Sequence, residues 1–413
     1  MRILMVHQNF PGQYKHLAPA LAARPQTEVV ALAMNETPAI PGVRVVRYGV
    51  ERGTSQHIHP WAADFETKLI RGEAAARAAQ RLRTEGFVPD IICAHPGWGE
   101  ALFLKDVWPE ARLLSFLEFY YHGRGADVGF DPEFPDNDLD ALCRVRSKNA
   151  NTLLSLEASD WAVSPTHWQR STAPACFRER ISVIFDGIDT DAVRPNPSAS
   201  ITLNNALTLT GADEVISFIN RNLEPYRGVH VFMRALPDIL ARRPRARVII
   251  VGGDQVSYGK APADGRTWRQ TLLEEVGPRL DLSRVHFVGH VPYPTFVALM
   301  QVSAVHIYLT YPFVLSWSVL EAMSAGALVI GSATPPVEEM IHDGETGLLV
   351  DFFDTAGLAR RVSEVLDHPD RMASLRGGAR QAVVEHYDLR RVCLPQQLAL
   401  VGQVAAGKLP RRP

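Results

Sequence analysis

The sequence has few cysteines and no long apolar run. Its four cysteines, Cys93, Cys143, Cys176 and Cys393, are widely spaced and form no Cys-x-x-Cys pair. This spacing excludes the common zinc and redox motifs and favours a reducing compartment. No segment approaches the ~20 apolar residues of a membrane span, and the first apolar run is too short for a signal peptide. We therefore expect a soluble, cytoplasmic protein, and peripheral membrane contact through a lipid-linked acceptor stays compatible with this expectation.

The sequence also lacks an excess of charge of one sign. It has 43 basic and 45 acidic residues, which gives a formal net charge of −2, and it has no basic stripe. Nucleic acid and anionic membrane surfaces are therefore not indicated as partners. Low-complexity tracts and short internal repeats are absent as well. With 413 residues and 46% hydrophobic content, the chain is long enough for two globular domains.

Strand patterns alternate with helix patterns in the first half of the chain, which predicts a parallel sheet with helices on both faces. We expect strands at Ile3–His7, Val29–Leu32, Val43–Arg47, Ile91–Cys93, Leu113–Phe116, Trp161–Ser164 and Ile181–Phe185. Helices are expected between them, at Gln13–Ala23, Asp64–Thr84, Glu100–Val107 and Leu139–Ala158.

The pattern breaks at Val193–Ser200, where two prolines among polar residues predict a linker. A second cycle of strands follows, at Val215–Ile219, Arg247–Val251, Val285–Val288, Val305–Leu309, Leu328–Ile330 and Gly347–Val350. The expected fold class is α/β, with two Rossmann-like domains facing each other across a cleft. We place the domains at 1–195 and 196–385, and we expect the tail 386–413 to be helical and to pack back on the first domain.

The stretch Thr310–Glu339 has the pattern of a binding site. The strand Val305–Leu309 runs into a loop, and a helix is expected to begin at Ser316 or Ser318 and to end at Gly326. Backbone N–H groups and the helix dipole converge on an anion at such an N-terminus. An ordinary strand–helix unit has the same local pattern, so the function depends on the other strand ends.

A nucleotide-linked sugar is the ligand that we predict for this loop and helix. Glu321, in the first turns of the helix, is predicted to hold the ribose. The residues predicted to hold the diphosphate and the sugar are Leu315, Ser316, Trp317 and Ser318.

Two arginines follow the first strand of the second domain. Arg221 and Arg227 lie six residues apart around a Glu-Pro turn, which suits two guanidinium groups that bind one diphosphate. A solvated pair of surface charges is the competing interpretation. Other strand ends offer close backbone approach or contact to a base, although each is also compatible with plain turn chemistry: Gly252, Gly253, His290 and Val291.

Polar and aromatic side chains follow three strands of the first domain. Gly12, in a Pro-Gly turn, suits close approach to a phosphate or sugar, although an ordinary turn explains it equally well. His95 follows one strand and Glu118 another, and both are candidates for proton handling. The residues after Glu118 have the aromatic character of an acceptor sugar site: Tyr120, Tyr121 and His122. A packed aromatic corner is the alternative.

Several segments together resemble the GT-B-fold glycosyltransferases of family 4, the retaining "group 1" enzymes. Phe185–Asp189 is similar to the family's NGVD segment, and Asn220–Gly228 to its GRL…KG segment. Ser318–Met323 resembles LxxLEAM, and Gly344–Val350 resembles DGxTGLLV. The resemblance covers nearly the whole chain and extends to a bacterial subgroup.

The resemblance implies a transferase that moves a hexosyl group from a UDP- or GDP-sugar to a hydroxyl of a glycan, a lipid-linked acceptor or a small molecule. It assigns the acceptor to the first domain and the donor to the second. The family has a pair of glutamates, and the resemblance assigns the first of the two to the donor hexose. In this sequence Phe313 stands at that position. No DxD motif occurs at a strand end, so we expect neither a metal nor another cofactor.

Two alternatives remain open from the sequence. A sugar-nucleotide 2-epimerase or hydrolase on the same fold would act without an acceptor. A non-catalytic nucleotide-binding partner subunit would account for Phe313, although a diphosphate clamp has no purpose there.

Overall fold

A computed structural model describes residues 1–204 and 206–410 of the chain. These residues form two compact units, Met1–Gly187 together with the chain from Arg390 onward, and Ile188–Leu389. The second unit thus begins at Ile188, before the predicted boundary at 195, and ends at Leu389, after the predicted boundary at 385. The proline-rich segment 193–200 therefore belongs to the second unit. The last three residues of the predicted tail lie outside the described residues.

The first unit is built on a seven-stranded parallel sheet of order β3-β2-β1-β4-β5-β6-β7. Its strands are short apolar runs, as expected for a sheet buried on both faces. They are β1 (Arg2–Val6), β2 (Glu28–Ala33), β3 (Val43–Arg47), β4 (Ile91–Ala94), β5 (Arg112–Phe116), β6 (Trp161–Ser164) and β7 (Ile181–Val183).

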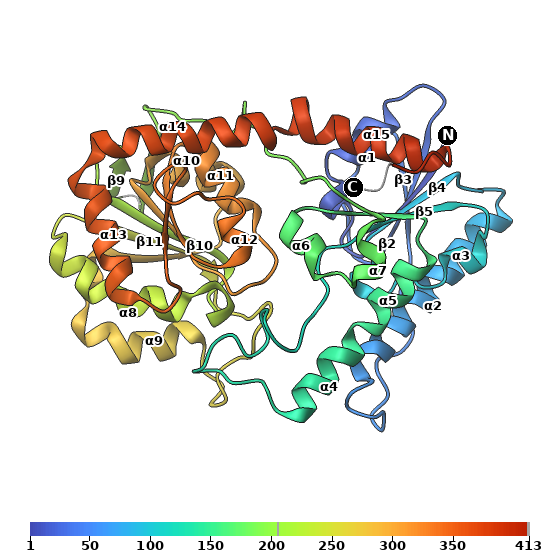
Figure 1. Cartoon of the computed structure of the whole chain (residues 1–413), viewed down its shortest axis with the longest axis horizontal. Helices are drawn as coiled ribbons and strands as arrows, with labels where there is room; N and C mark the ends of the chain where they lie inside the picture. Colours follow the sequence, from blue (N-terminus) through green and yellow to red (C-terminus); the bar gives the residue numbers. More distant parts are fainter. Residues whose placement is uncertain (205, 411–413) are drawn as a thin grey trace. The chain divides into compact units, whose positions relative to one another are not determined.

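Two layers of helices cover this sheet (Figure 1). Alternate residues of β1 point to opposite faces, so that Met5 lies in one apolar core and Leu4 in the other. One face is covered by α1 (Leu17–Ala22) and α15 (Leu394–Ala405), and the other by α2 (Ala63–Thr84), α3 (Leu104–Val107) and α5 (Ala150–Ala158). The remaining helices of the unit are α4 (Leu139–Lys148), α6 (His167–Thr172) and α7 (Ala175–Arg178).

The second unit repeats this plan on a six-stranded parallel sheet of order β12-β11-β10-β13-β14-β15. The strands are β10 (Val215–Asn222), β11 (Arg247–Gly253), β12 (Val285–Gly289), β13 (Val305–Tyr308), β14 (Leu328–Ser332) and β15 (Leu348–Val350). The six strands that the sequence predicts here are therefore all present.

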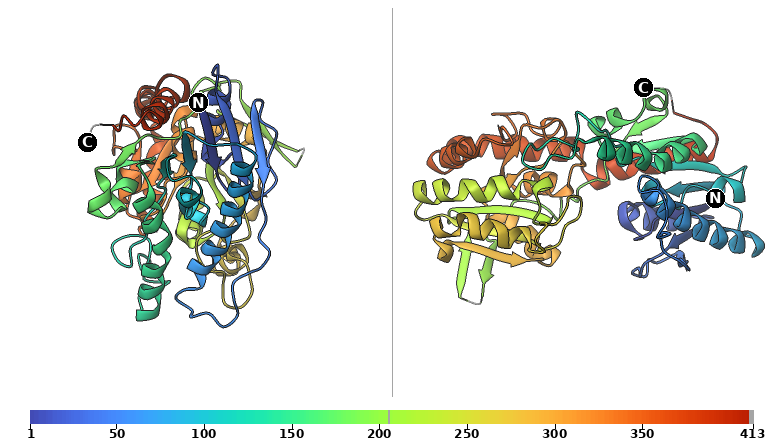
Figure 2. Two further views of the ribbon diagram at one scale, coloured as in Figure 1. Left: turned by 90° about the vertical axis from the view of Figure 1, so that its right-hand side faces the viewer. Right: turned by 90° about the horizontal axis from the view of Figure 1, so that it is seen from below.

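Helices lie on both faces of the second sheet as well (Figures 1 and 2). One layer contains α8 (Val229–Arg242), α9 (Trp268–Val276) and α13 (Thr355–Asp367). The other contains α10 (Tyr293–Val302), α11 (Trp317–Ala325) and α14 (Pro369–His386), and a short helix, α12 (Pro335–Glu338), follows β14.

Three local predictions were wrong. An antiparallel hairpin, β8 (Ser200–Leu203) and β9 (Leu207–Thr210), follows the proline-rich segment, where no strand was expected. The helix predicted at 139–158 is two helices separated at Asn149. The side-chain amide of Asn149 forms hydrogen bonds with both the N–H and the C=O of Tyr121. The helix predicted from Glu100 begins only at Leu104, and Glu100 itself is buried before it and accepts a hydrogen bond from Tyr48.

The predicted fold class is confirmed: each unit is a Rossmann-like α/β domain, and the last helix, α15, packs on the sheet of the first unit. Ligands of such sheets bind beyond the carboxyl ends of the strands. None of the helices in the described part of the chain combines the length and the apolar character that a membrane crossing needs.

The return of α15 to the first unit is tested by truncating one of its buried side chains. Leu400 is 4% exposed in the core beneath α1, whereas Leu409, past the end of the helix, is 45% exposed. We expect Leu400→Ala to lower the free energy of unfolding by about 2–5 kcal/mol because it leaves a cavity. Leu409→Ala should stay within about 0.5 kcal/mol. Urea denaturation followed by circular dichroism measures both, and equal losses would contradict this packing.

Candidate functional site

The N-terminus of α11 is capped where the sequence predicts it. Ser316 is the N-cap and accepts a hydrogen bond from the Ser318 N–H, and Gly326 ends the helix with a left-handed φ of 89°. The N–H of Ser316 donates to the buried Tyr308 hydroxyl at 2.8 Å. The strand β13 and the helix α11 therefore fix the loop between them at both ends.

Arg227 is buried beneath this loop, with 6% of its surface exposed. Its Nη1 donates to Thr310 Oγ1 at 2.8 Å and to the Val314 carbonyl at 3.0 Å. It forms no ion pair with a carboxylate among the described residues, and the nearby carboxylate of Glu224 is bonded elsewhere. Burial alone would lower the pKa of Arg227, but its neighbours, Tyr308 first, raise it, so the guanidinium is charged.

Glu224, which the sequence analysis did not single out, is fully buried three residues before Arg227. Its carboxylate accepts from the backbone N–H groups of Ser257, Tyr258 and Gly259 at 2.8–3.0 Å. Glu224 therefore shapes the loop that follows β11. The only signal in the sequence was the Glu-Pro turn itself, which does not reveal what the carboxylate binds.

The carboxyl ends of β10, β11 and β12 bring four predicted residues together. A Cβ on Gly253 would lie 2.6 Å from the His290 ring, and Gly252 has a φ of +155° with Leu223 and Asn220 close by. His290 Nε2 lies 2.8 Å from the Arg221 carbonyl. The Arg221 guanidinium itself is exposed, so only Arg227 of the two arginines is held in place by the protein.

Glu321 and Phe313 have aromatic partners. Tyr293, at the start of α10, donates its hydroxyl to Glu321 Oε1 at 2.7 Å. Phe313 is 3% exposed and packs edge-on against Tyr258 and Tyr226, with ring centroids at 4.9 and 5.5 Å. An apolar ring therefore fills the position where the resemblance has a carboxylate. Of the other predicted donor residues, Leu315 is buried, Val291 is half-buried and Trp317 is 40% exposed.

A second set of polar side chains lies in the first unit. His95 follows β4, is 2% exposed, and stacks on Trp98 and Phe116. Its Nδ1 accepts from the Gly97 N–H at 3.1 Å, which leaves the ring proton on Nε2. Nε2 has no hydrogen-bond partner in the described chain and lies 3.6 Å from the Glu118 carboxylate. The Glu118 side chain is 38% exposed whereas His95 Nε2 is buried, so Glu118 is the one of the two that is open to a substrate hydroxyl.

The predicted acceptor residues are tied to neighbouring helices. The Tyr120 N–H donates to Thr172 Oγ1, and His122 Nε2 lies 2.7 Å from the Thr172 carbonyl. The Lys148 ammonium lies 3.7 Å from the centre of the Tyr121 ring. Burial raises the pKa of the Tyr120 hydroxyl, so this phenol stays protonated and can donate.

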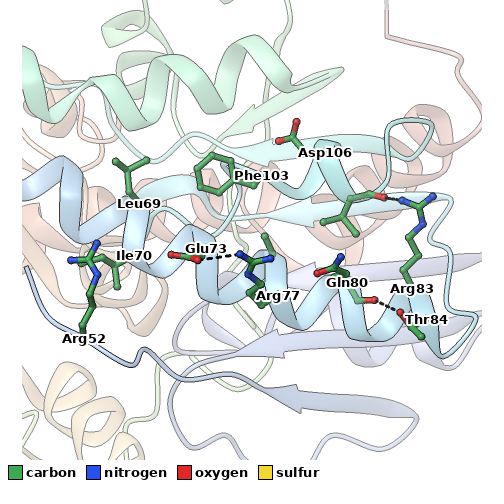
Figure 3. A pocket seen from close by; sticks show the side chains of 12 residues that line it. Arg52, Leu69, Ile70, Glu73, Arg77, Gln80, Arg83, Thr84, Phe103 and Asp106 are labelled. Atoms are coloured by element: carbon green, nitrogen blue, oxygen red, sulfur yellow. Dashed lines mark hydrogen bonds and ion pairs between the residues drawn. The ribbon is translucent and has the colours of Figure 1, made fainter.

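A groove of 780 Å³ lies beside α2 in the first unit (Figure 3). Arg77 pairs with Glu73 on its wall, and Arg83 donates to the Val107 carbonyl. The groove contains none of the predicted site residues, and its arginines have protein partners. We therefore place the candidate site at the strand ends and not in this groove.

The geometry defines a protein of the GT-B class, with two Rossmann-like domains and polar side chains at the strand ends of each. A family model described as "Glycosyl transferase family 4 group" matches residues 25–193, and another described as "Glycosyl transferases group 1" matches residues 203–382. The chain belongs to the group 1, family 4 glycosyltransferases.

One relative is a D-inositol 3-phosphate glycosyltransferase of Acidothermus cellulolyticus, 27% identical over 215 residues. The match covers 51% of this chain and 46% of that protein, so the chain spans about half the length of this relative. Two solved structures share the fold. Sucrose-phosphate synthase from Thermosynechococcus elongatus has a TM-score of 0.75 and 19% identity, and the match covers 98% of this chain and 100% of that one. HepE of Anabaena, in complex with UDP, has a TM-score of 0.67 and 16% identity, and the match covers 97% of this chain and 98% of that one.

Glu224 is predicted to hold the 257–259 loop in place. Glu224→Gln replaces one acceptor oxygen by an NH₂ group that faces backbone N–H donors, so we expect a loss of about 1–3 kcal/mol in unfolding free energy. The amides of Ser257, Tyr258 and Gly259 should also exchange faster with deuterium. Glu345→Gln, at a carboxylate that is 77% exposed, is the matched control. Unchanged exchange at all three amides would refute this role.

Proposed function

We propose that this chain is a retaining glycosyltransferase that moves a hexosyl group from a UDP- or GDP-linked sugar to a hydroxyl acceptor. The observation that carries the proposal is the charged guanidinium of Arg227, buried without a carboxylate ion pair in the described chain. The Glu224 carboxylate offsets part of this charge through space, but it is hydrogen-bonded to backbone N–H groups. Burying a charge that is only partly offset is costly. An anion bound at the loop before α11 would offset that cost.

A leaving nucleotide diphosphate is the anion that fits this position. When the bond from the sugar C1 to the phosphate oxygen breaks, negative charge builds on the diphosphate. Arg227, Arg221 and the N-terminus of α11 would stabilise that charge, and no metal is required for it. The UDP bound to HepE, which has the same fold, supports a nucleotide of this kind.

Other strand-end residues of the second unit would bind the rest of the donor. Glu321 is proposed to accept hydrogen bonds from the ribose, with Tyr293 fixing one of its oxygens. Gly252, Gly253 and His290 would lie against the nucleotide. Because Phe313 is apolar, the donor hexose receives no carboxylate acceptor from that position.

The acceptor is assigned to the first unit. Glu118 is proposed to position the acceptor, with the buried His95 Nε2–H lying 3.6 Å from its carboxylate and supporting it. Retention needs no protein nucleophile if the acceptor attacks from the face that the phosphate leaves. The leaving phosphate then takes the proton of the acceptor hydroxyl.

A sugar-nucleotide 2-epimerase or hydrolase and a non-catalytic subunit are less well supported. An epimerase or hydrolase has no use for an acceptor site, and a non-catalytic subunit has no use for a diphosphate clamp. Incubation with UDP- and GDP-sugars and a panel of hydroxyl acceptors separates these functions. Transfer that depends on the acceptor supports the proposal, whereas an epimerised donor, donor hydrolysis alone, or no reaction with any donor contradicts it.

Removal of either arginine is expected to slow turnover. Arg227→Ala and Arg221→Ala should each reduce kcat about 10²–10³-fold, because the charge on the leaving group loses a partner. Release of UDP or GDP measures this rate. Arg242→Ala, at an exposed residue of α8 that pairs with Asp238, is the control and should keep the wild-type rate. Wild-type rates in both site variants would overturn the assignment of the diphosphate site.

Chelation of divalent metals is expected to leave turnover unchanged. The positive charge at the leaving group comes from guanidinium groups and a helix N-terminus, which EDTA does not remove. Turnover with EDTA and with added Mg²⁺ or Mn²⁺ measures this. A loss of activity in EDTA that Mn²⁺ restores would contradict metal-independent transfer.

A further inference from the structure

His7 is a buried histidine with no role in the proposed reaction. It follows β1 and is 3% exposed. Its Nδ1 accepts from the backbone N–H of Asn9 at 3.0 Å, and its Nε2 lies 2.8 Å from Gln13 Oε1. A backbone N–H only donates, so Nδ1 carries no proton, and Nε2–H donates to Gln13. The ring is therefore a neutral imidazole whose two nitrogens both bind the loop that follows β1.

The surroundings of His7 keep it neutral. Burial first, and then the neighbouring His95, lower the pKa of His7 to about 3, although its hydrogen bonds and the Glu118 carboxylate act in the opposite direction. The ring thus holds one tautomer throughout the neutral pH range. A group with two fixed hydrogen bonds and one protonation state suits a structural support and not a proton carrier.

The same ring contacts two loops that contain predicted site residues. Gly12 has a left-handed φ of +47°, and a Cβ at this position would lie 2.3 Å from His7 Nε2. On its other side, the His7 ring meets Trp98 and His95 edge-on, with centroids at 4.8 and 5.3 Å. The loop 9–13 and the loop 95–98 therefore both rest on one imidazole.

We propose that His7 is a positioning residue for substrate, which fixes Gly12 and His95 relative to each other without touching the substrate itself. The kinetic consequence rests on the proposed glycosyl transfer. The placement of the two loops does not, because it follows from the hydrogen bonds and ring contacts of His7 alone.

Two variants separate the hydrogen bonds of His7 from its bulk. His7→Phe keeps a ring for Trp98 and His95 but loses both nitrogen contacts, and Gln13→Ala removes only the partner of Nε2. We expect kcat to fall about 10- to 100-fold in His7→Phe, the scale of a small misplacement of substrate, and less in Gln13→Ala. The dissociation constant for UDP should change less than kcat does, because the residues proposed to hold the diphosphate, Arg227 and the N-terminus of α11, belong to the second unit. His57→Phe, at an exposed histidine of the same unit, is the control.

Nuclear magnetic resonance tests the same inference without any turnover. The ¹⁵N shifts of His7 in the wild-type chain should show the Nε2–H tautomer and no titration between pH 5 and 8. The backbone amide resonances of Gly97 and Trp98 should move in His7→Phe and not in His57→Phe. A titrating His7, unmoved amides in the 95–98 loop, or an unchanged kcat in an active His7→Phe enzyme would each overturn the proposal. If the wild-type chain transfers no sugar, the proposed function is contradicted. The resonance measurements then still decide whether His7 positions the two loops.

Discussion

The buried guanidinium of Arg227 is the interaction on which the candidate site depends. Its nitrogen is bonded to the Thr310 hydroxyl and to the Val314 carbonyl, and both acceptors belong to the loop between β13 and α11. These neutral oxygens hold the cation in place, and the buried Glu224 carboxylate offsets part of its charge through space. In a poorly solvated position, such a charge interacts strongly with any anion that arrives. The same hydrogen bonds also fix the loop whose end is the capped N-terminus of α11.

Both units use a buried polar side chain to shape a loop at the end of a strand. In the second unit, Glu224 accepts hydrogen bonds from three backbone N–H groups and so holds the loop 257–259 in place. His7 binds both ends of the loop after β1 in the first unit. Neither side chain is exposed to a substrate. Each is hydrogen-bonded to a neighbouring loop, so buried side chains fix the course of the main chain at the ends of these strands.

The strands of the two parallel sheets, most helices and the caps of α11 followed from the sequence, because they depend on local pattern. Apolar runs of three to five residues separated by helical periods predict the two parallel sheets, and Ser316 and Gly326 predict the ends of α11. Glu224, His7 and the break at Asn149 did not follow, since their roles depend on partners tens of residues away or on the course of a neighbouring loop. The burial of Phe313 among tyrosines was equally out of reach, because the sequence shows which residue replaces the carboxylate but not what surrounds it.

A calorimetric comparison of UDP with UMP tests the diphosphate site most directly. The two ligands differ only by the terminal phosphate, so the ratio of their dissociation constants isolates the contribution of the second phosphate. We expect the wild-type chain to bind UDP at least about tenfold more tightly than UMP, a difference of about 1.4 kcal/mol. We expect Arg227→Met to have a clearly smaller ratio, because only Arg221 and the N-terminus of α11 then remain for the second phosphate. An Arg227→Met variant that keeps the wild-type ratio would contradict the account.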